Sequence, residues 1–226
     1  MWLVVLKKLF MSTPKEKMAE KLMEASKSPE HSSTISDAIL NYLIENTVVS
    51  GSSSGGSSET LSLIKSSTSS GGSLDTSGFS GWASSIENFI INNLVLNNSG
   101  SESILFGPGL NLTQDMIGSA HKSCLYYWES VSNLSEEEKN TAIEIQSTND
   151  FPASISVGSY GKISSEYYIC KFNENAPNPH RIIWEKISEQ IILWIEDISC
   201  HNTSFTTESS GEGESETLTI TSIIVN

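Results

Sequence analysis

Apolar residues recur every three to four positions near the start of the chain, a spacing that predicts two amphipathic helices. A Thr-Pro pair at 13–14 places a cap residue before a proline at the first helical position, where the missing N–H costs nothing. A Ser-Pro pair at 28–29 repeats this signal, and the second helix is expected to run to about Asn46. Residues 11–49 are therefore predicted to form a helical hairpin with one apolar face.

The apolar stripe of the first helix is narrow, so that helix would be marginal on its own and would need a surface to rest on. We expect the apolar face of the hairpin to bind a partner protein. The residues expected to make this contact are Met18, Leu22, Ile35, Ile39, Tyr42 and Leu43.

Serine and glycine dominate residues 50–80, and such segments behave as flexible coil. This stretch is therefore predicted to be a tether. Residues 61–65 (Leu-Ser-Leu-Ile-Lys) alternate apolar and polar side chains, so a sharper alternative is a tether in which this piece docks as an edge strand, in the same chain or on another. A self-contained serine-rich repeat is disfavoured, since no fixed period is present.

Residues 81–226 are predicted to form a helix-rich α+β domain with a small antiparallel sheet. Helical spacing marks four stretches, with a capping box of Ser135 and Glu138 before the third: 81–97, 113–132, 135–145 and 180–199. The last of these is the most apolar and is expected to be the core element of the domain. Alternation and β-branched residues predict strands near 155–157 and 162–172, joined around 158–161, and a final strand at 217–225.

The chain has 226 residues and a formal net charge of −14, with 27 acidic and 13 basic side chains. A protein that binds nucleic acid needs a basic face to displace counterions from phosphates, and here the positive charges are mainly at residues 7–27. Binding to DNA, RNA or an anionic membrane surface by the main body is therefore disfavoured. The acidity suits solubility and a basic partner.

The first ten residues (MWLVVLKKLF) contain an apolar run that is too short for a signal peptide, and its lysines follow the run instead of preceding it. Our hypothesis is that Met11 is the native initiator and that residues 1–10 are an over-called start. The alternative is a short amphipathic membrane anchor. Secretion through a signal peptide is not expected.

The chain has three cysteines, and a small, odd number of cysteines does not indicate a disulfide framework. This number favours reduced thiols inside a cell. The four Asn-x-Ser/Thr sequons match the number expected by chance in a chain this rich in serine, threonine and asparagine. They begin at Asn97, Asn111, Asn133 and Asn202. They carry no information beyond composition.

Candidate catalytic and cofactor motifs are missing from the sequence: there is no nucleophile elbow and no glycine-rich phosphate loop. Zinc is the one metal that deserves a test, because His121, Cys124, Cys200 and His201 form a chemically suitable donor set. Their spacing differs from known zinc motifs, and the adjacent pair at 200–201 would strain tetrahedral coordination. We therefore expect no metal and no cofactor. The tryptophans are expected to pack in the core.

The stretch MSTPKEKMAEKLMEASKSPEHSSTISDAILNYLIENTVVSG, residues 11–51, resembles the opening of small virion structural proteins of tailed bacteriophages. Those proteins also begin with a lysine-rich helix, a Ser-Pro-Glu-His-like break and an Ile-x-x-Ala-Ile helix before a Gly/Ser stretch. The resemblance covers about a fifth of the chain and implies a role in the phage head or tail without catalysis.

The sequence thus predicts a non-enzymatic assembly protein, attached through its N-terminal helices. Its partners would be proteins, as a homo-oligomer or a larger particle, and its location the virion or the host cytoplasm. Two alternatives stay open: a secreted or surface adhesion protein, and an enzyme whose site is built from scattered residues.

Overall fold

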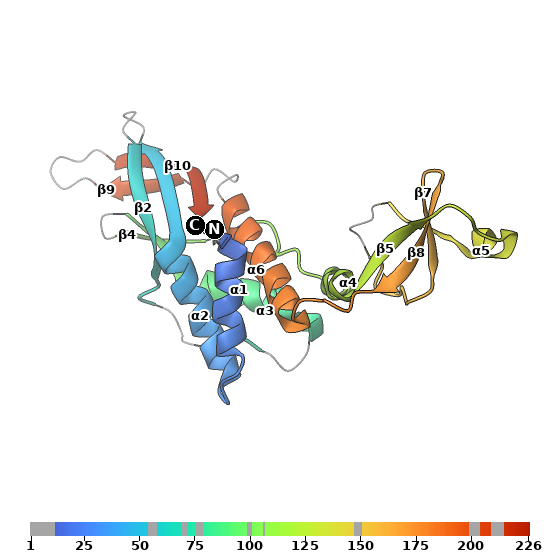
Figure 1. Cartoon of the computed structure of the whole chain (residues 1–226). Helices are drawn as coiled ribbons and strands as arrows, with labels where there is room; N and C mark the ends of the chain where they lie inside the picture. The colour runs from blue at the N-terminus through green and yellow to red at the C-terminus, as the bar shows by residue number, and fades with distance from the viewer. Residues whose placement is uncertain are drawn as a thin grey trace, which may run out of the picture.

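The computed structural model describes residues 12–53, 58–68, 72–75, 79–98, 101–105, 107–146, 151–198, 204–208 and 215–226. The described chain has an α+β fold with six α-helices and two sheets, which confirms the predicted class. Figure 1 shows a large lobe, built on a six-stranded sheet, and a small lobe that projects from it. The expectations for residues 1–10 and for an initiator at Met11 lie outside the described residues.

The N-terminal helical hairpin is present as predicted, with α1 at Pro14–Ala25 and α2 at His31–Asn46. The Thr13 cap is completed by Glu16, whose carboxylate accepts a hydrogen bond from the Thr13 amide at 2.7 Å. This capping box satisfies backbone donors that the first turn leaves unpaired. Helix α1 packs against α2 and against α6 (Pro179–Ile198), so the hairpin belongs to the large lobe's core.

The prediction of a flexible tether is wrong for the described residues between 50 and 80 that form strands. Strand β1 (Thr47–Ser53) and strand β2 (Ser58–Lys65) are antiparallel neighbours. Val49 and Leu61 lie opposite each other, and their exposed fractions are 0% and 3%. Small serines are sufficient on the other face, because an antiparallel sheet needs only one buried face. The alternative of a docked strand at 61–65 is right, but that strand is internal and pairs within the same chain.

The six-stranded sheet has the order β4-β3-β2-β1-β10-β9, and all its neighbours are antiparallel. Its other strands are β3 (Leu94–Asn98), β4 (Ser101–Ile104), β9 (Ser204–Glu208) and β10 (Ser215–Val225). Strand β10 confirms the predicted C-terminal strand and pairs with β1. The helix predicted over 81–97 is shorter: α3 is Trp82–Asn93, preceded by a 3₁₀ turn at Phe79–Gly81.

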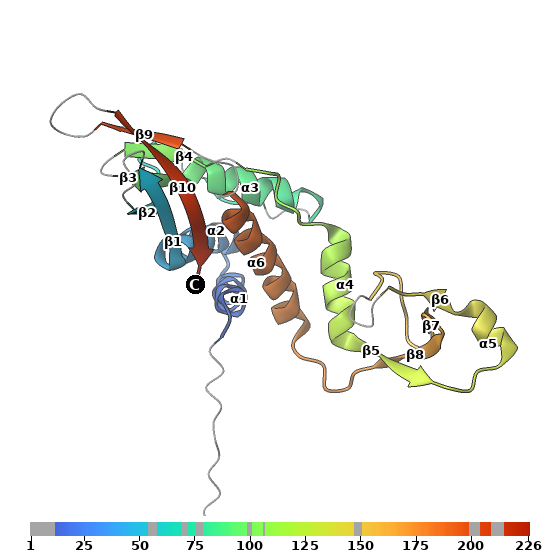
Figure 2. The same cartoon turned by 90° about the horizontal axis from the view of Figure 1, so that it is seen from above.

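The core of the large lobe lies between this sheet and helices α2, α3 and α6, which cover one of its faces (Figure 2). Helix α6 confirms the prediction of a dominant core helix. Its residues Ile187, Ile191 and Ile195 are at most 1% exposed. Among the helices that the structure describes, none combines the length and the apolar character of a membrane span.

The small lobe comprises residues 126–172 and is joined to the large lobe through α4 (Gln114–Leu125) and the segment before α6. Its sheet has the order β5-β8-β7-β6, in which only the β6–β7 pair is parallel. The elements are β5 (Tyr126–Val131), α5 (Glu136–Thr141), β6 (Ile143–Glu144), β7 (Tyr160–Ile163) and β8 (Glu166–Phe172). It has its own core: Trp128, Ile145, Phe151, Ile155 and Cys170.

Four predictions for this region are corrected and one is confirmed. The helix predicted over 135–145 ends at Thr141, and Ile143 belongs to strand β6. The helix predicted over 113–132 ends at Leu125, because the aromatic run that follows suits a pleated strand. Residues 155–157 are not a strand. The turn predicted at 158–161 is instead at Ser164, between β7 and β8. Ser164 has a left-handed φ of 55°. The predicted capping box before α5 is confirmed.

Candidate functional site

The residues predicted to bind a partner through the helical hairpin are buried inside the chain itself. Met18, Leu22, Ile35, Ile39, Tyr42 and Leu43 are all between 0% and 5% exposed. Tyr42 even joins the two ends of the described chain, since its hydroxyl lies 2.8 Å from the Pro14 carbonyl oxygen and 3.0 Å from that of Asn226. The sheet and α6 occupy this apolar face, so it is not available to a partner in this structure.

The candidate zinc ligands are not brought together in the described residues. Cys124 is buried on α4, where its thiol donates to the carbonyl oxygen of Pro177 at 3.1 Å. Burial raises the pKa of this thiol, which disfavours the thiolate that a metal requires. Cys200 and His201 lie outside the described residues. Among the described residues, no three metal-ligating side chains lie close enough together to hold an ion. His121 is therefore not part of such a group.

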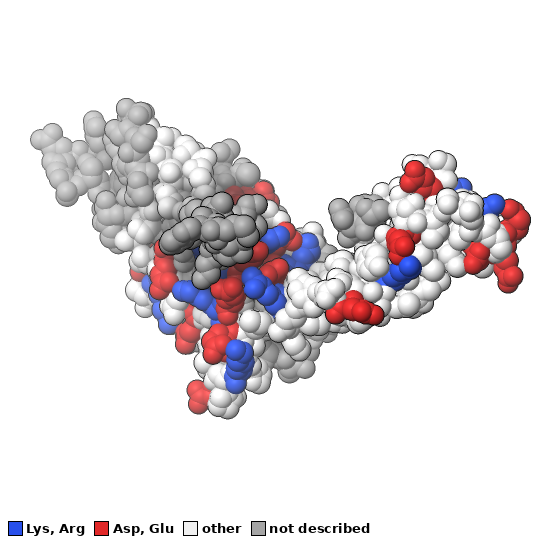
Figure 3. Space-filling model, in the orientation of Figure 1, with Lys and Arg blue, Asp and Glu red and all other residues white. Residues whose placement is uncertain are grey.

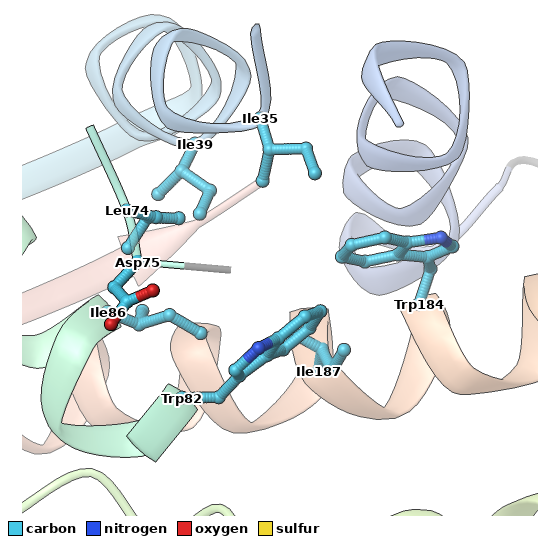
Figure 4. Close-up of a pocket in the computed structure, with 8 residues that line it drawn as sticks. All are labelled: Ile35, Ile39, Leu74, Asp75, Trp82, Ile86, Trp184 and Ile187. Carbon is cyan, nitrogen blue, oxygen red and sulfur yellow. The ribbon is translucent and has the colours of Figure 1, made fainter. Parts of the chain in front are cut away.

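Two tryptophans line a small apolar pocket at one end of the large lobe (Figure 4). Trp82 on α3 and Trp184 on α6 have ring centroids 5.8 Å apart, and Ile35 and Ile39 lie on the α2 side of the pocket. The cavity volume of about 10 Å³ is close to the minimum that holds one water molecule. The pocket is therefore a closely packed end of the core and not a ligand site.

Trp128 and Trp194 pack in the core, as the sequence predicted. Trp128 is 9% exposed and Trp194 is 4% exposed. Trp82 and Trp184 are only partly buried and pack against the core from its edge. No aromatic platform of the kind that stacks on sugars is left on the outside by Trp128 or Trp194.

The small lobe presents one sheet face that the described elements leave largely uncovered, with α5 contacting only its β7 edge; we call it the bare face. Residues directly opposite each other on antiparallel strands share a face, so the register assigns Trp128 and Cys170 to the core side. The alternate positions point away from that core. They are Tyr127, Glu129 and Val131 on β5, Tyr167, Ile169 and Lys171 on β8, Tyr160 and Lys162 on β7, and Glu144 on β6.

The side chains of the bare face are exposed or half-buried, and Tyr127 is 45% exposed. Three tyrosines give it large, rigid contact area with a hydroxyl at the end of each ring. Tyrosine is enriched where proteins bind each other for this reason.

Charges on the bare face are balanced, in contrast to the chain as a whole. Glu129 and Lys171 form an ion pair at 2.5 Å, and the hydrogen bond from Lys171 to this carboxylate raises the pKa of the lysine. Lys162 lies 5.4 Å from the centroid of Tyr167 and beside Glu144 in the register. The bare face thus carries two lysines and two glutamates, whose charges cancel, although the whole chain has a net charge of −14.

Carboxylates also gather at α5, next to the bare face. Figure 3 shows carboxylates gathered at the far end of the small lobe, over α5, and mixed charges over the helices of the large lobe. Hydrogen bonds from Tyr160, at 2.6 Å, and from Ser135 lower the pKa of Glu138 on α5. This half-buried carboxylate is the capping group of α5, and its lowered pKa is the opposite of the raised pKa that a general acid requires.

Sequence reasoning missed the bare face because it assigned Tyr126 to Val131 to a helix. The signal that could have found it is the alternation in residues 166–172, where the two-residue period separates Tyr167, Ile169 and Lys171 from Tyr168 and Cys170. No protein-family model matches the chain, and no similar protein was found among the curated proteins or the solved structures.

Proposed function

We propose that this chain is a non-enzymatic assembly protein, a structural subunit of a larger particle such as a phage virion, and that a second copy binds to its bare face. The observation that carries this proposal is the projecting small lobe, whose sheet is covered on one side only.

The small lobe has a separate core of five buried residues and extends away from the sheet of the large lobe. None of its described residues belongs to the large lobe's core. A one-sided sheet held away from the body, with tyrosines on its open side, has the geometry of a contact surface between proteins.

The charge distribution supports a second copy as the occupant. Two chains with a net charge of −14 repel each other over most of their surfaces. The bare face avoids this repulsion, since Lys162 and Lys171 balance Glu129 and Glu144. A strongly basic partner would instead be attracted to the acidic end of the lobe, at α5.

The sequence-based idea of attachment through the N-terminal helices is replaced by this surface. The resemblance of residues 11–51 to virion structural proteins stays a supporting observation, because it concerns the type of particle and not the contact residues.

The proposal of a structural role is tested by quantitative mass spectrometry of particles purified from the source that encodes the chain. We expect the protein in a fixed copy number per particle, retained through density-gradient purification. Presence in the producing cells with loss from purified particles would contradict a structural role.

A further inference from the structure

An open groove lies against the C-terminal half of α6. Gln190, Leu193 and Asp197 line one wall, and Pro108, Gly109 and Asn111 line the other. The groove volume is about 430 Å³, within the range of ordinary ligand sites. Leu193 gives the groove an apolar patch, with 53% of the residue exposed.

The wall opposite α6 is held in place by specific contacts. The Trp194 indole N–H donates to the Pro108 carbonyl oxygen. The Leu110 amide donates to the Glu87 carboxylate of α3 at 2.8 Å. Because both helices hold this segment, the shape of the groove is fixed by the core.

Gln190 is the unusual residue of the groove. It is only 8% exposed, yet its carboxamide makes no hydrogen bond to any described residue, and it lines the groove. Its side-chain nitrogen and oxygen are not among the fully buried unpartnered atoms of the described residues, so they stay open to the groove. A molecule bound in the groove can therefore pair with this carboxamide without displacing a hydrogen bond inside the chain.

The groove chemistry narrows the ligand class. Asp197 and the acidic chain disfavour nucleic acid and other anions. Trp194 is 4% exposed and offers no open ring face for a sugar. A carboxamide that offers one donor side and one acceptor side matches the N–H and C=O of a peptide backbone.

The spacing fits a short peptide segment. Gln190, Leu193 and Asp197 lie at i, i+3 and i+7 and share one face of α6. The distance along the helix axis from the first to the last is about 10 Å, from a rise of 1.5 Å per residue. That length corresponds to about three residues of extended chain.

We propose that this groove binds an extended peptide segment of a partner protein, with a backbone amide paired to Gln190, an apolar side chain on Leu193 and a lysine or arginine paired to Asp197. This site is independent of the self-association proposed for the bare face.

The test is selection from a random heptapeptide display library against the immobilised full-length protein. We expect enrichment of peptides with an apolar residue followed, two or three positions later, by lysine or arginine. Synthetic versions should bind about fivefold more weakly to a Gln190→Met variant and about tenfold more weakly to Asp197→Asn, given the usual strengths of neutral and charged hydrogen bonds. Asp115→Asn, which neutralises an exposed carboxylate on α4, is the matched control and should bind as the wild type does.

Thermal unfolding of Gln190→Met separates a binding role from a structural one. An unpaired amide that is replaced by an apolar side chain of similar volume should leave the melting temperature unchanged or raise it. The proposal is overturned if no sequence is enriched, if enriched peptides bind both variants as they bind the wild type, or if Gln190→Met is strongly destabilised.

Discussion

Gly107 stands where the backbone of one segment touches a side chain of α6. A Cβ atom at this position would lie 2.8 Å from Cγ1 of Ile198. We predict that Gly107→Ala lowers the free energy of unfolding by about 1–3 kcal/mol, the usual cost of overpacking a filled site. Gly72→Ala is the control, because no atom lies within 4 Å of its added Cβ. Equal denaturation midpoints for the two variants would show that the contact at Gly107 is not tight.

The hydrogen bond from Tyr160 to Glu138 makes a prediction about pH. The pKa of Glu138 is lowered in the folded protein, so the bond contributes stability above the ordinary carboxyl pKa of 4.5, and this contribution is lost as the pH falls through the lowered value. Tyr160→Phe should therefore be less stable than the wild type at pH 7, and the difference should shrink below pH 4.5.

Chemical denaturation at a series of pH values measures this effect. Tyr167→Phe is the control, because the ring of Tyr167 contacts Lys162 while its hydroxyl has no hydrogen bond within the described residues. A difference for Tyr160→Phe that is the same at low and neutral pH would rule out the carboxylate as the cause.

Single residues near a helix end were predictable because their partners are close in sequence. The caps at Thr13 and Ser135 follow from three-residue spacing. The fate of an apolar side chain such as Leu22 was not predictable in this way, because only the tertiary fold decides whether the chain or a partner covers it.

At the scale of elements, burial of α1 predicts a stability effect. Leu22 is 0% exposed, so Leu22→Ala should lower the free energy of unfolding by about 2–5 kcal/mol through loss of apolar contact and the cavity left behind. Met23→Ala, beside it and only partly buried, should cost distinctly less. If Leu22→Ala kept full stability in denaturant titrations, α1 would not be a core helix.

Strands β1 and β2 predict slow amide exchange in a segment whose composition indicates a tether. Strand β1 is paired with β2 on one side and β10 on the other. Hydrogen exchange followed by mass spectrometry or NMR should show protection over 49–52 and 61–64 comparable to that of α6. Exchange at the rate of an unstructured chain would contradict the sheet.

Composition misled here because serine and glycine are compatible with either a coil or a strand with one solvated face. What decides between them is β10, more than 150 residues later in the chain, which supplies the pairing edge. In contrast, α6 was predictable in full, since a long apolar stripe with helical spacing has no other way to be buried.

At the scale of the whole molecule, two separate cores explain the projecting lobe. The chain leaves the large lobe through α4 and returns before α6, so the small lobe is an insertion between core elements. The sequence indicated an α+β body but not this division, because the aromatic run of β5 continues the helical pattern of α4 without a break. The bare face exists only because of the division.

The most direct test of the assembly proposal is the light-scattering mass of the full-length protein over a range of concentrations. We predict a mass that rises from 24.6 kDa toward twice that value, while a Tyr127→Ser/Tyr167→Ser double variant stays at 24.6 kDa. Val157→Ser, at an exposed apolar position in the loop before β7, should behave like the wild type. A wild-type protein that stays monomeric at every concentration, or an oligomer that the double variant leaves intact, would contradict self-assembly through the bare face.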